Sequence, residues 1–124
     1  NDKNYFNENV EKTIARHEVK ISLEEVVMVA SKLLKNNGTF AMVHRTERLL
    51  EIFDLFRKYH IEPKRVRFVY EFVHKPSTLV LIEGIKHGKL GLKVESPFIM
   101  KMDDGSYSSE YERFLVEVKS SETE

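Results

Sequence analysis

An uncharged apolar run that ends in a polar pair and leads straight into a helix-periodic segment is the strongest constraint in this sequence. Residues 39–43 carry no charged side chain, which is typical of a strand buried on both faces of a sheet. His44 and Arg45 follow, and we expect Thr46 to cap a helix whose apolar residues recur at helical spacing from Leu49. Ligands of open α/β sheets lie outside the carboxyl ends of strands. His44 and Arg45 are therefore candidate ligand-side residues.

The directions of these two side chains follow from the strand before them. Successive side chains of a strand alternate between its faces, so His44 and Arg45 should point to opposite sides. We expect Arg45 to donate a charge-assisted hydrogen bond to Glu18 or Glu47. The alternative is that both residues simply end a strand in water.

Composition sets the broad class. A chain of 124 residues is long enough for one domain with a moderate core, and its 20 basic residues are balanced by 20 acidic ones. Any basic surface must therefore be local. The absence of cysteine excludes disulfides and thiolate chemistry. No apolar run reaches the roughly 18 residues of a membrane helix, and the polar start carries no secretory signal, so we expect a cytoplasmic protein.

The remaining patterns predict the order helix, strand, helix, strand, strand and a small appendix. Ser22 and Glu25 form a capping box, and Gly38 should supply the left-handed turn after the first helix. Two apolar runs separated by a short turn read as an antiparallel hairpin. The expected elements are helices 22–34, 47–60 and a last one capped by Ser108 or Ser109, with strands 39–44, 66–73, 78–85 and 98–100.

The domain boundaries expected from these patterns are a flexible segment over 1–13, a domain over 14–119 and a disordered tail over 120–124. Few strands are available for an α/β fold, and so small a sheet leaves both edges open. The sequence begins with Asn rather than Met. We therefore expect the second half of a larger doubly wound sheet.

Four separate blocks of this sequence resemble one family of enzymes, in the order in which that family has them. The blocks are Ile14-Ala15-Arg16-His17-Glu18, Phe40-Ala41-Met42-Val43-His44-Arg45, Glu62-Pro63-Lys64-Arg65-Val66-Arg67 and Leu81-Ile82-Glu83-Gly84-Ile85-Lys86. The family is the class I S-adenosylmethionine-dependent methyltransferases, and within it the bacterial small-domain group similar to the tRNA1(Val) adenine-37 N6-methyltransferase. The resemblance implies the carboxyl-terminal half of a Rossmann-like methyltransferase sheet that ends in an antiparallel hairpin.

The same resemblance implies S-adenosylmethionine as cofactor and tRNA as partner. Family members hold the cofactor with a glycine-rich loop and the target base with an Asn-Pro-Pro-Tyr motif. Neither motif occurs in this sequence, so no cofactor-binding or catalytic residue can be assigned. We expect this chain by itself to be inactive. The five histidines lack close ligand spacing, so no metal site is predicted.

Besides His44 and Arg45 on the substrate side, two groups of residues are candidates for contact with substrate. Arg16, His17 and Glu18 would lie next to the target base, although three consecutive charged residues also suit an ion-paired surface. Basic residues around the predicted hairpin could bind the phosphates of tRNA, or could simply be solvated cations near a helix end. This RNA-binding set comprises Lys64, Arg65, Arg67, Lys75 and Lys86.

A function of a different class is also compatible with the sequence. A half sheet with open edges favours pairing with another strand, so the chain could be a non-catalytic binding or self-assembly module that forms a homodimer. The alternating aromatic residues Phe68, Tyr70 and Phe72 fit core packing better than base stacking, because one face of a hairpin must be buried.

Overall fold

The computed structural model describes residues 21–123, with side chains through Val118. The predicted residues Arg16, His17 and Glu18 and the predicted flexible segment therefore lie outside the described residues. The described elements are α2 (Leu23–Leu33), β1 (Thr39–Arg45), the 3-10 turn η1 (Thr46–Arg48), α3 (Leu49–Lys58), β2 (Ile61–Phe72), β3 (Leu79–Lys86), β4 (Lys93–Val94), β5 (Phe98–Lys101) and α4 (Ser109–Thr123).

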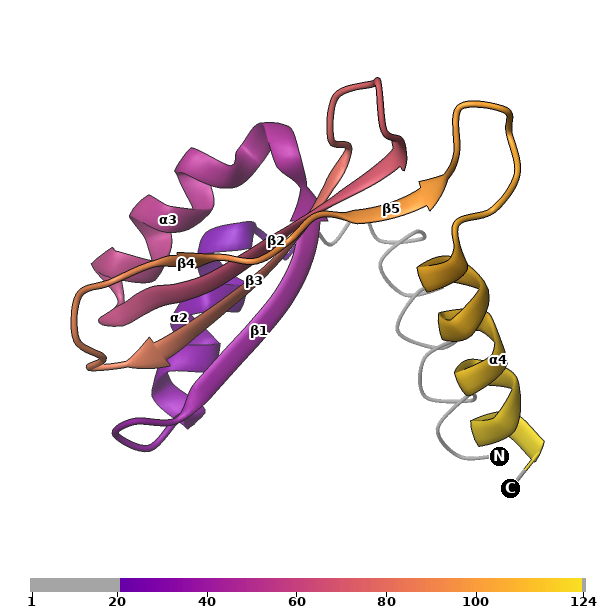
Figure 1. Cartoon of the computed structure of the whole chain (residues 1–124). Coiled ribbons are helices and arrows are strands. Elements are labelled where there is room, and N and C mark those ends of the chain that lie inside the picture. The colour runs from indigo at the N-terminus through magenta and orange to yellow at the C-terminus, as the bar shows by residue number, and fades with distance from the viewer. Residues whose placement is uncertain (1–20, 124) are drawn as a thin grey trace.

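Strand β3 lies between β1 and β2 and runs antiparallel to both (Figure 1). Met42 of β1 is level with Ile82 of β3, which is level with Val66 of β2. Strands β4 and β5 both pair with β2 in parallel. The predicted α/β fold, ending in an antiparallel hairpin, is therefore confirmed as an open five-stranded sheet.

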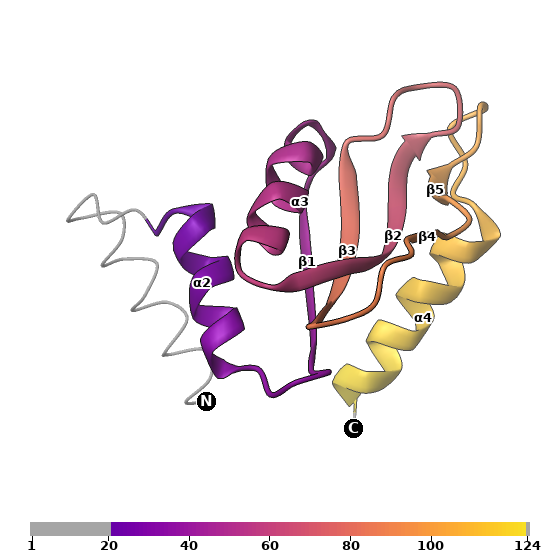
Figure 2. The same ribbon diagram turned by 90° about the vertical axis from the view of Figure 1, so that its left-hand side faces the viewer.

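Helices α2 and α3 cover one face of this sheet, and α4 lies on the other side (Figure 2). The core forms where the two helices meet β1, β2 and β3, and its fully enclosed side chains are Val27, Ile52, Phe56, Ile61, Val66, Val80 and Ile82. Alternation along β1 sends Phe40 and Met42 toward this core. Within the described residues, no helix is long and apolar enough to cross a membrane.

The prediction that residues 39–43 are buried on both faces is wrong. Val43 is 55% exposed and its cross-strand neighbour Leu81 is 39% exposed, on the face opposite α2 and α3. The physical reason is that α4 packs against β5, at the other side of the sheet from β1. The lack of charged residues in this strand therefore does not imply that both of its faces are buried.

The first helix begins as predicted but ends differently. The backbone N–H of Glu25 donates to Ser22 Oγ at 3.1 Å, which confirms the capping box. The left-handed residue after the helix is Asn37, with φ 64°, and not Gly38. Gly38 is needed for space, since a Cβ there would lie 2.9 Å from the carbonyl oxygen of Lys35.

Two further boundaries differ from prediction. Thr46 does not cap α3: it opens the 3-10 turn, and its Oγ1 instead lies 2.9 Å from Ser77 Oγ. Strand β2 begins at Ile61, five residues before the predicted start at Val66, and passes through the buried Pro63 by means of an irregularity in its pairing with β3. Proline is accepted within a strand at a bulge of this kind, where the register of the pairing shifts by one residue.

The carboxyl-terminal part adds one strand that the sequence did not predict. Strand β5 matches the expected run 98–100, whereas β4 spans only two residues and carries no periodicity. Ser108 caps the last helix as expected, with Tyr111 N–H donating to its Oγ at 3.0 Å. Helix α4 continues through Thr123. Residues 120–123, which we expected in a disordered tail, are therefore part of this helix.

Candidate functional site

His44 and Arg45 lie at the carboxyl end of β1, at a corner where the chain turns into α3. Side-chain alternation places His44, half-buried, toward the helices and leaves Arg45 exposed on the opposite face, as predicted. The backbone N–H of Arg45 donates to His44 Nδ1 at 2.8 Å. The imidazole must therefore carry its proton on Nε2 when this bond is made.

The turn between β2 and β3 holds this corner in place. The backbone N–H of Thr46 donates to the carbonyl of Thr78 at 3.1 Å. Ser77 Oγ meets Thr46 Oγ1 and also lies 2.9 Å from the carbonyl oxygen of Val69 and 3.0 Å from that of Leu79. Ser77 was missed by sequence reasoning, because a serine in a turn gives no sign of a partner 31 residues earlier.

Arg45 forms an ion pair with Glu47, one of the two partners expected. The guanidinium Nη1 lies 3.6 Å from Glu47 Oε1, a distance beyond a hydrogen bond, and the two side chains are 67% and 70% exposed. The other expected partner, Glu18, lies outside the described residues. An exposed pair of this kind contributes little to stability, so the Arg45 side chain is available to a ligand at the carboxyl end of β1.

A groove of about 680 Å³ lies on the sheet face that α2 and α3 do not cover. Ala41, Val43 and Leu81 contribute apolar surface to it. Arg65 and Arg67 line the groove but are neutralised by carboxylates: Arg65 lies 3.3 Å from Glu83 and 3.7 Å from Glu95, and Arg67 pairs with Glu110. This groove therefore combines apolar surface with two guanidinium groups and three carboxylates, and it carries no excess of positive charge.

The residues predicted to bind RNA do not form one face. Lys75 lies in the β2–β3 turn, at the same end of the sheet as His44, whereas Lys64 and Lys86 lie at the opposite end (Figure 1). Arg65 and Arg67 occupy the groove between them. Lys86 Nζ donates to the carbonyl oxygens of Ser31 and Leu34, so this side chain also caps the end of α2.

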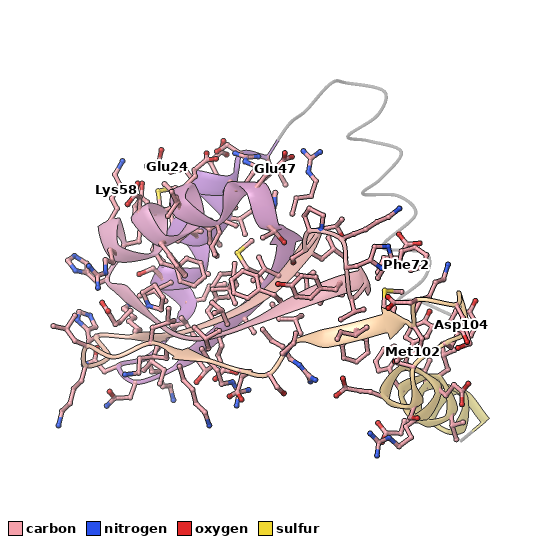
Figure 3. All side chains as sticks on the ribbon, turned by 45° about the horizontal axis from the view of Figure 1, so that its top comes forward. Glu24, Glu47, Lys58, Phe72, Met102 and Asp104 are labelled. Atoms are coloured by element: carbon pink, nitrogen blue, oxygen red, sulfur yellow. The ribbon has the colours of Figure 1, made fainter. Side chains whose placement is uncertain are left out.

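Lys58, the last residue of α3, forms an ion pair with Glu24 of α2. Glu24 accepts hydrogen bonds from Lys58 Nζ and, at 2.6 Å, from the Tyr59 hydroxyl. Figure 3 shows Glu24 and Lys58 close together on the helical layer, away from Phe72. The hydrogen bond from Lys58, followed by that from Tyr59, lowers the pKa of the Glu24 carboxyl below its usual range. The same carboxylate raises the pKa of Lys58 and of Tyr59.

Cations also gather around Phe72 at the carboxyl end of β2. Lys75 Nζ lies 5.2 Å and Lys101 Nζ 5.4 Å from the centre of the Phe72 ring. His74 Nδ1 lies 2.9 Å from Asp103 Oδ1, and Lys101 is paired with Glu71 at 3.4 Å. Because carboxylates among the described residues accompany Lys101 and His74, though not Lys75, this end is less basic than its lysines suggest.

The described residues do not fit S-adenosylmethionine, the cofactor implied by the resemblance. The turn from β1 to α3 contains no glycine that would let a cofactor approach the backbone. Gly84 instead makes room for the core, since a Cβ there would lie 2.6 Å from Ile61 Cγ2. No group of three or more His, Cys, Asp or Glu residues suited to a metal occurs in the described part of the chain.

No protein-family model matches this sequence, and no curated protein matches it. Among solved structures, the chain is similar to a predicted O-methyltransferase, protein Atu636 from Agrobacterium tumefaciens. The TM-score is 0.63 and the sequence identity is 16%; the match covers 69% of this chain and 41% of that one. Identity this low reports on the fold alone. The described residues therefore adopt a methyltransferase-like α/β fold, and the chain spans less than half of the structure that it matches.

Proposed function

We propose that this chain is the carboxyl-terminal part of an S-adenosylmethionine-dependent methyltransferase that methylates the N6 nitrogen of adenine in tRNA. The strand arrangement carries this proposal: β3 is inserted antiparallel between β1 and β2, which run in the same direction. Class I methyltransferase sheets finish in this way. The adenine and tRNA assignment is supported by the sequence blocks of the resemblance, three of which fall within the sheet and its flanking turns.

The chemical role of the described residues in this proposal is positioning. S-adenosylmethionine supplies an electrophilic methyl group when bound, and the residues that would hold it are not among those described. Methyl transfer to nitrogen depends on aligning the reacting atoms, and a misplacement of about 1 Å can cost a hundredfold in rate. His44 and Arg45 suit this role because their corner is fixed by Thr46 and Ser77.

The experiment compares this chain with the protein encoded when its reading frame is extended upstream. We expect calorimetric titration with S-adenosylmethionine to show binding only for the extended protein. We also expect the extended protein to convert adenine in a tRNA transcript to N6-methyladenine, identified by mass spectrometry of the nucleosides. The absence of both a glycine-rich loop and an Asn-Pro-Pro-Tyr motif upstream would overturn the proposal, as would methylation confined to hydroxyl substrates.

In the extended protein, Arg45→Ala is expected to slow single-turnover methyl transfer about tenfold while changing stability by no more than about 0.5 kcal/mol. The small stability effect follows from the exposed, 3.6 Å ion pair with Glu47. Arg48→Ala is the matched control, because Arg48 lies on the same turn and pairs with Glu51 at 2.7 Å. Wild-type activity in Arg45→Ala, or equal losses in both variants, would leave Arg45 a structural residue.

A second candidate function, self-assembly, is favoured by the free edge of β1. Within the described chain, β1 has β3 as its one strand neighbour. The N–H of Thr46 and the carbonyl of Gly38 form hydrogen bonds on the β3 side of this strand. Backbone groups alternate in direction along an antiparallel strand, so the N–H and C=O groups of Thr39, Ala41 and Val43 point away from β3, toward the free edge. Two copies paired about Ala41 would match these three residues and extend the sheet.

The length of such a ladder is limited at both ends. The N–H of Arg45 is already bound by His44 Nδ1, and the N–H of Asn37 donates to the carbonyl of Lys86 at 2.9 Å. A partner strand can therefore pair only between Thr39 and Val43. This segment has no charge and no proline, the features that usually protect an edge.

If this edge pairs, the chain should elute as a dimer in size-exclusion chromatography with light scattering, and Ala41→Pro should be monomeric with an unchanged circular dichroism spectrum. Proline removes the outward N–H of Ala41 without touching the bonds to β3. Leu90→Pro serves as the control, since Leu90 lies in exposed coil between β3 and β4. A wild-type monomer at every concentration tested would reject self-assembly.

A further inference from the structure

The end of the sheet opposite His44 carries positive charge that carboxylates do not neutralise. It is formed by the carboxyl end of α3, the start of β2, the end of β3 and the coil that leads to β4 (Figure 1). We call this surface the basic end and define it by Lys64, Lys86, Lys89, His60 and His87. It is separate from the His44–Arg45 corner and from the groove.

Two of the three lysines of the basic end, Lys64 and Lys86, are held by carbonyl oxygens. Lys64 Nζ donates to the carbonyl of Lys89 at 2.8 Å, and Lys86 donates to two carbonyls at the end of α2. Among the described residues, none of the three lysines has a carboxylate within salt-bridge distance. Backbone carbonyls fix the position of an ammonium group without cancelling its charge.

The nearby carboxylates are occupied by other cations. Glu62 binds Arg57 at 2.9 Å, and Glu24 binds Lys58. Both acids are therefore balanced within their own pairs, and the lysines of the basic end remain as net positive charge. The chain as a whole has equal numbers of basic and acidic residues, so this surface is a local excess of positive charge.

Two exposed histidines stack on each other beside these lysines. The rings of His60 and His87 lie 5.6 Å apart between centres and are tilted by only 6°. Both residues are left-handed, with φ 63° and 57°, and the N–H of His87 donates to the carbonyl of His60 at 2.8 Å. Non-glycine residues adopt this conformation only when their surroundings hold them there.

A hollow of about 340 Å³ adjoins this stack, and its lining includes both histidines, Leu90, and Arg57 with its partner Glu62. Flat rings beside fixed cations are the combination that binds single-stranded nucleic acid, because bases stack on the rings and phosphates bind the cations. The histidine backbone geometry keeps the stack in place before any ligand arrives.

We propose that the basic end binds the sugar-phosphate backbone of single-stranded RNA, with Lys64, Lys86 and Lys89 near the phosphates and a base against the histidine stack. The choice of RNA as the polyanion rests on the proposed function. The surface lies at the opposite end of the sheet from His44 and Arg45, so it contacts the RNA away from the methylated base.

The test measures binding of this chain to a short fluorescent single-stranded RNA by anisotropy over a range of salt concentrations. Lys64→Gln with Lys89→Gln is expected to weaken binding about tenfold and to reduce the slope of log K against log salt by about 0.7 per lysine removed. Arg113→Gln removes an exposed cation from α4, on the other side of the sheet, so it is the matched control and should behave as wild type.

The histidines give an independent readout. Asparagine tolerates left-handed backbone, so His60→Asn with His87→Asn should keep the fold and weaken binding at pH 8 without changing the salt slope. Unchanged binding in the double lysine variant, an equal loss in Arg113→Gln, or equally tight binding of inorganic pyrophosphate would overturn the assignment.

The two proposals fail separately. If the extended protein transfers no methyl group to adenine while the lysine variants still lose RNA binding, the proposed function fails and the basic end stands. If the extended protein methylates tRNA and the double lysine variant matches wild type in both binding and methylation, the basic end is wrong and the proposed function stands.

Discussion

Phe56→Ala is expected to lower the free energy of unfolding by about 3 to 5 kcal/mol, because it removes a fully buried aromatic ring and leaves a cavity. Phe56 is 0% exposed, and its ring centre lies 5.6 Å from that of Phe40 on β1. Its Cδ2 also lies against Gly84 of β3. One side chain of α3 thus contacts two strands.

Urea denaturation followed by circular dichroism measures this loss. Domains of this kind are stable by about 5 to 15 kcal/mol, so the variant should unfold at a much lower urea concentration. Leu50→Ala is the control on the same helix, since Leu50 is 78% exposed and should change stability by about 0.5 kcal/mol or less. Similar losses in the two variants would contradict the packing of α3 on the sheet.

Helices and strands with a clear period were predictable from the sequence. The capping box of Ser22 begins α2, and the alternation of β1 sends His44 and Arg45 to opposite faces. These features depend on neighbours within a few residues. Thr46 was mispredicted because its hydroxyl meets Ser77, which lies 31 residues later in the chain. A local rule cannot anticipate a partner that only the folded sheet brings near.

The site was less predictable than the fold for a geometric reason. Strand β2 has 12 residues and spans about 40 Å at 3.3 Å per residue, so Lys64 near its start and Lys75 beyond its end lie far apart. The predicted RNA-binding set therefore combined lysines that are close in sequence but lie at opposite ends of the folded sheet. The histidine stack joins His60 and His87, which are far apart in sequence, and their pairing follows from the antiparallel register of β2 and β3.

Gly84 carries the second large effect. It lies within β3, level with Phe40 and Pro63 on the two neighbouring strands. A Cβ there would lie 2.6 Å from Ile61 Cγ2 and 3.0 Å from both Phe56 Cδ2 and the carbonyl of Glu62. The position requires glycine because β2 and α3 both approach it closely.

Gly84→Ala is accordingly expected to destabilise the domain by about 2 to 3 kcal/mol, the upper range for overpacking a core. Ile61→Ala removes the nearest clashing atom but leaves a cavity of its own, since Ile61 is fully buried. A double-mutant cycle measured by urea denaturation tests this coupling. The double variant should lose less stability than the sum of the two single losses, by more than about 0.5 kcal/mol. Strict additivity would show that the added methyl is accommodated elsewhere, and that the contact between β3 and Ile61 does not set the requirement for glycine.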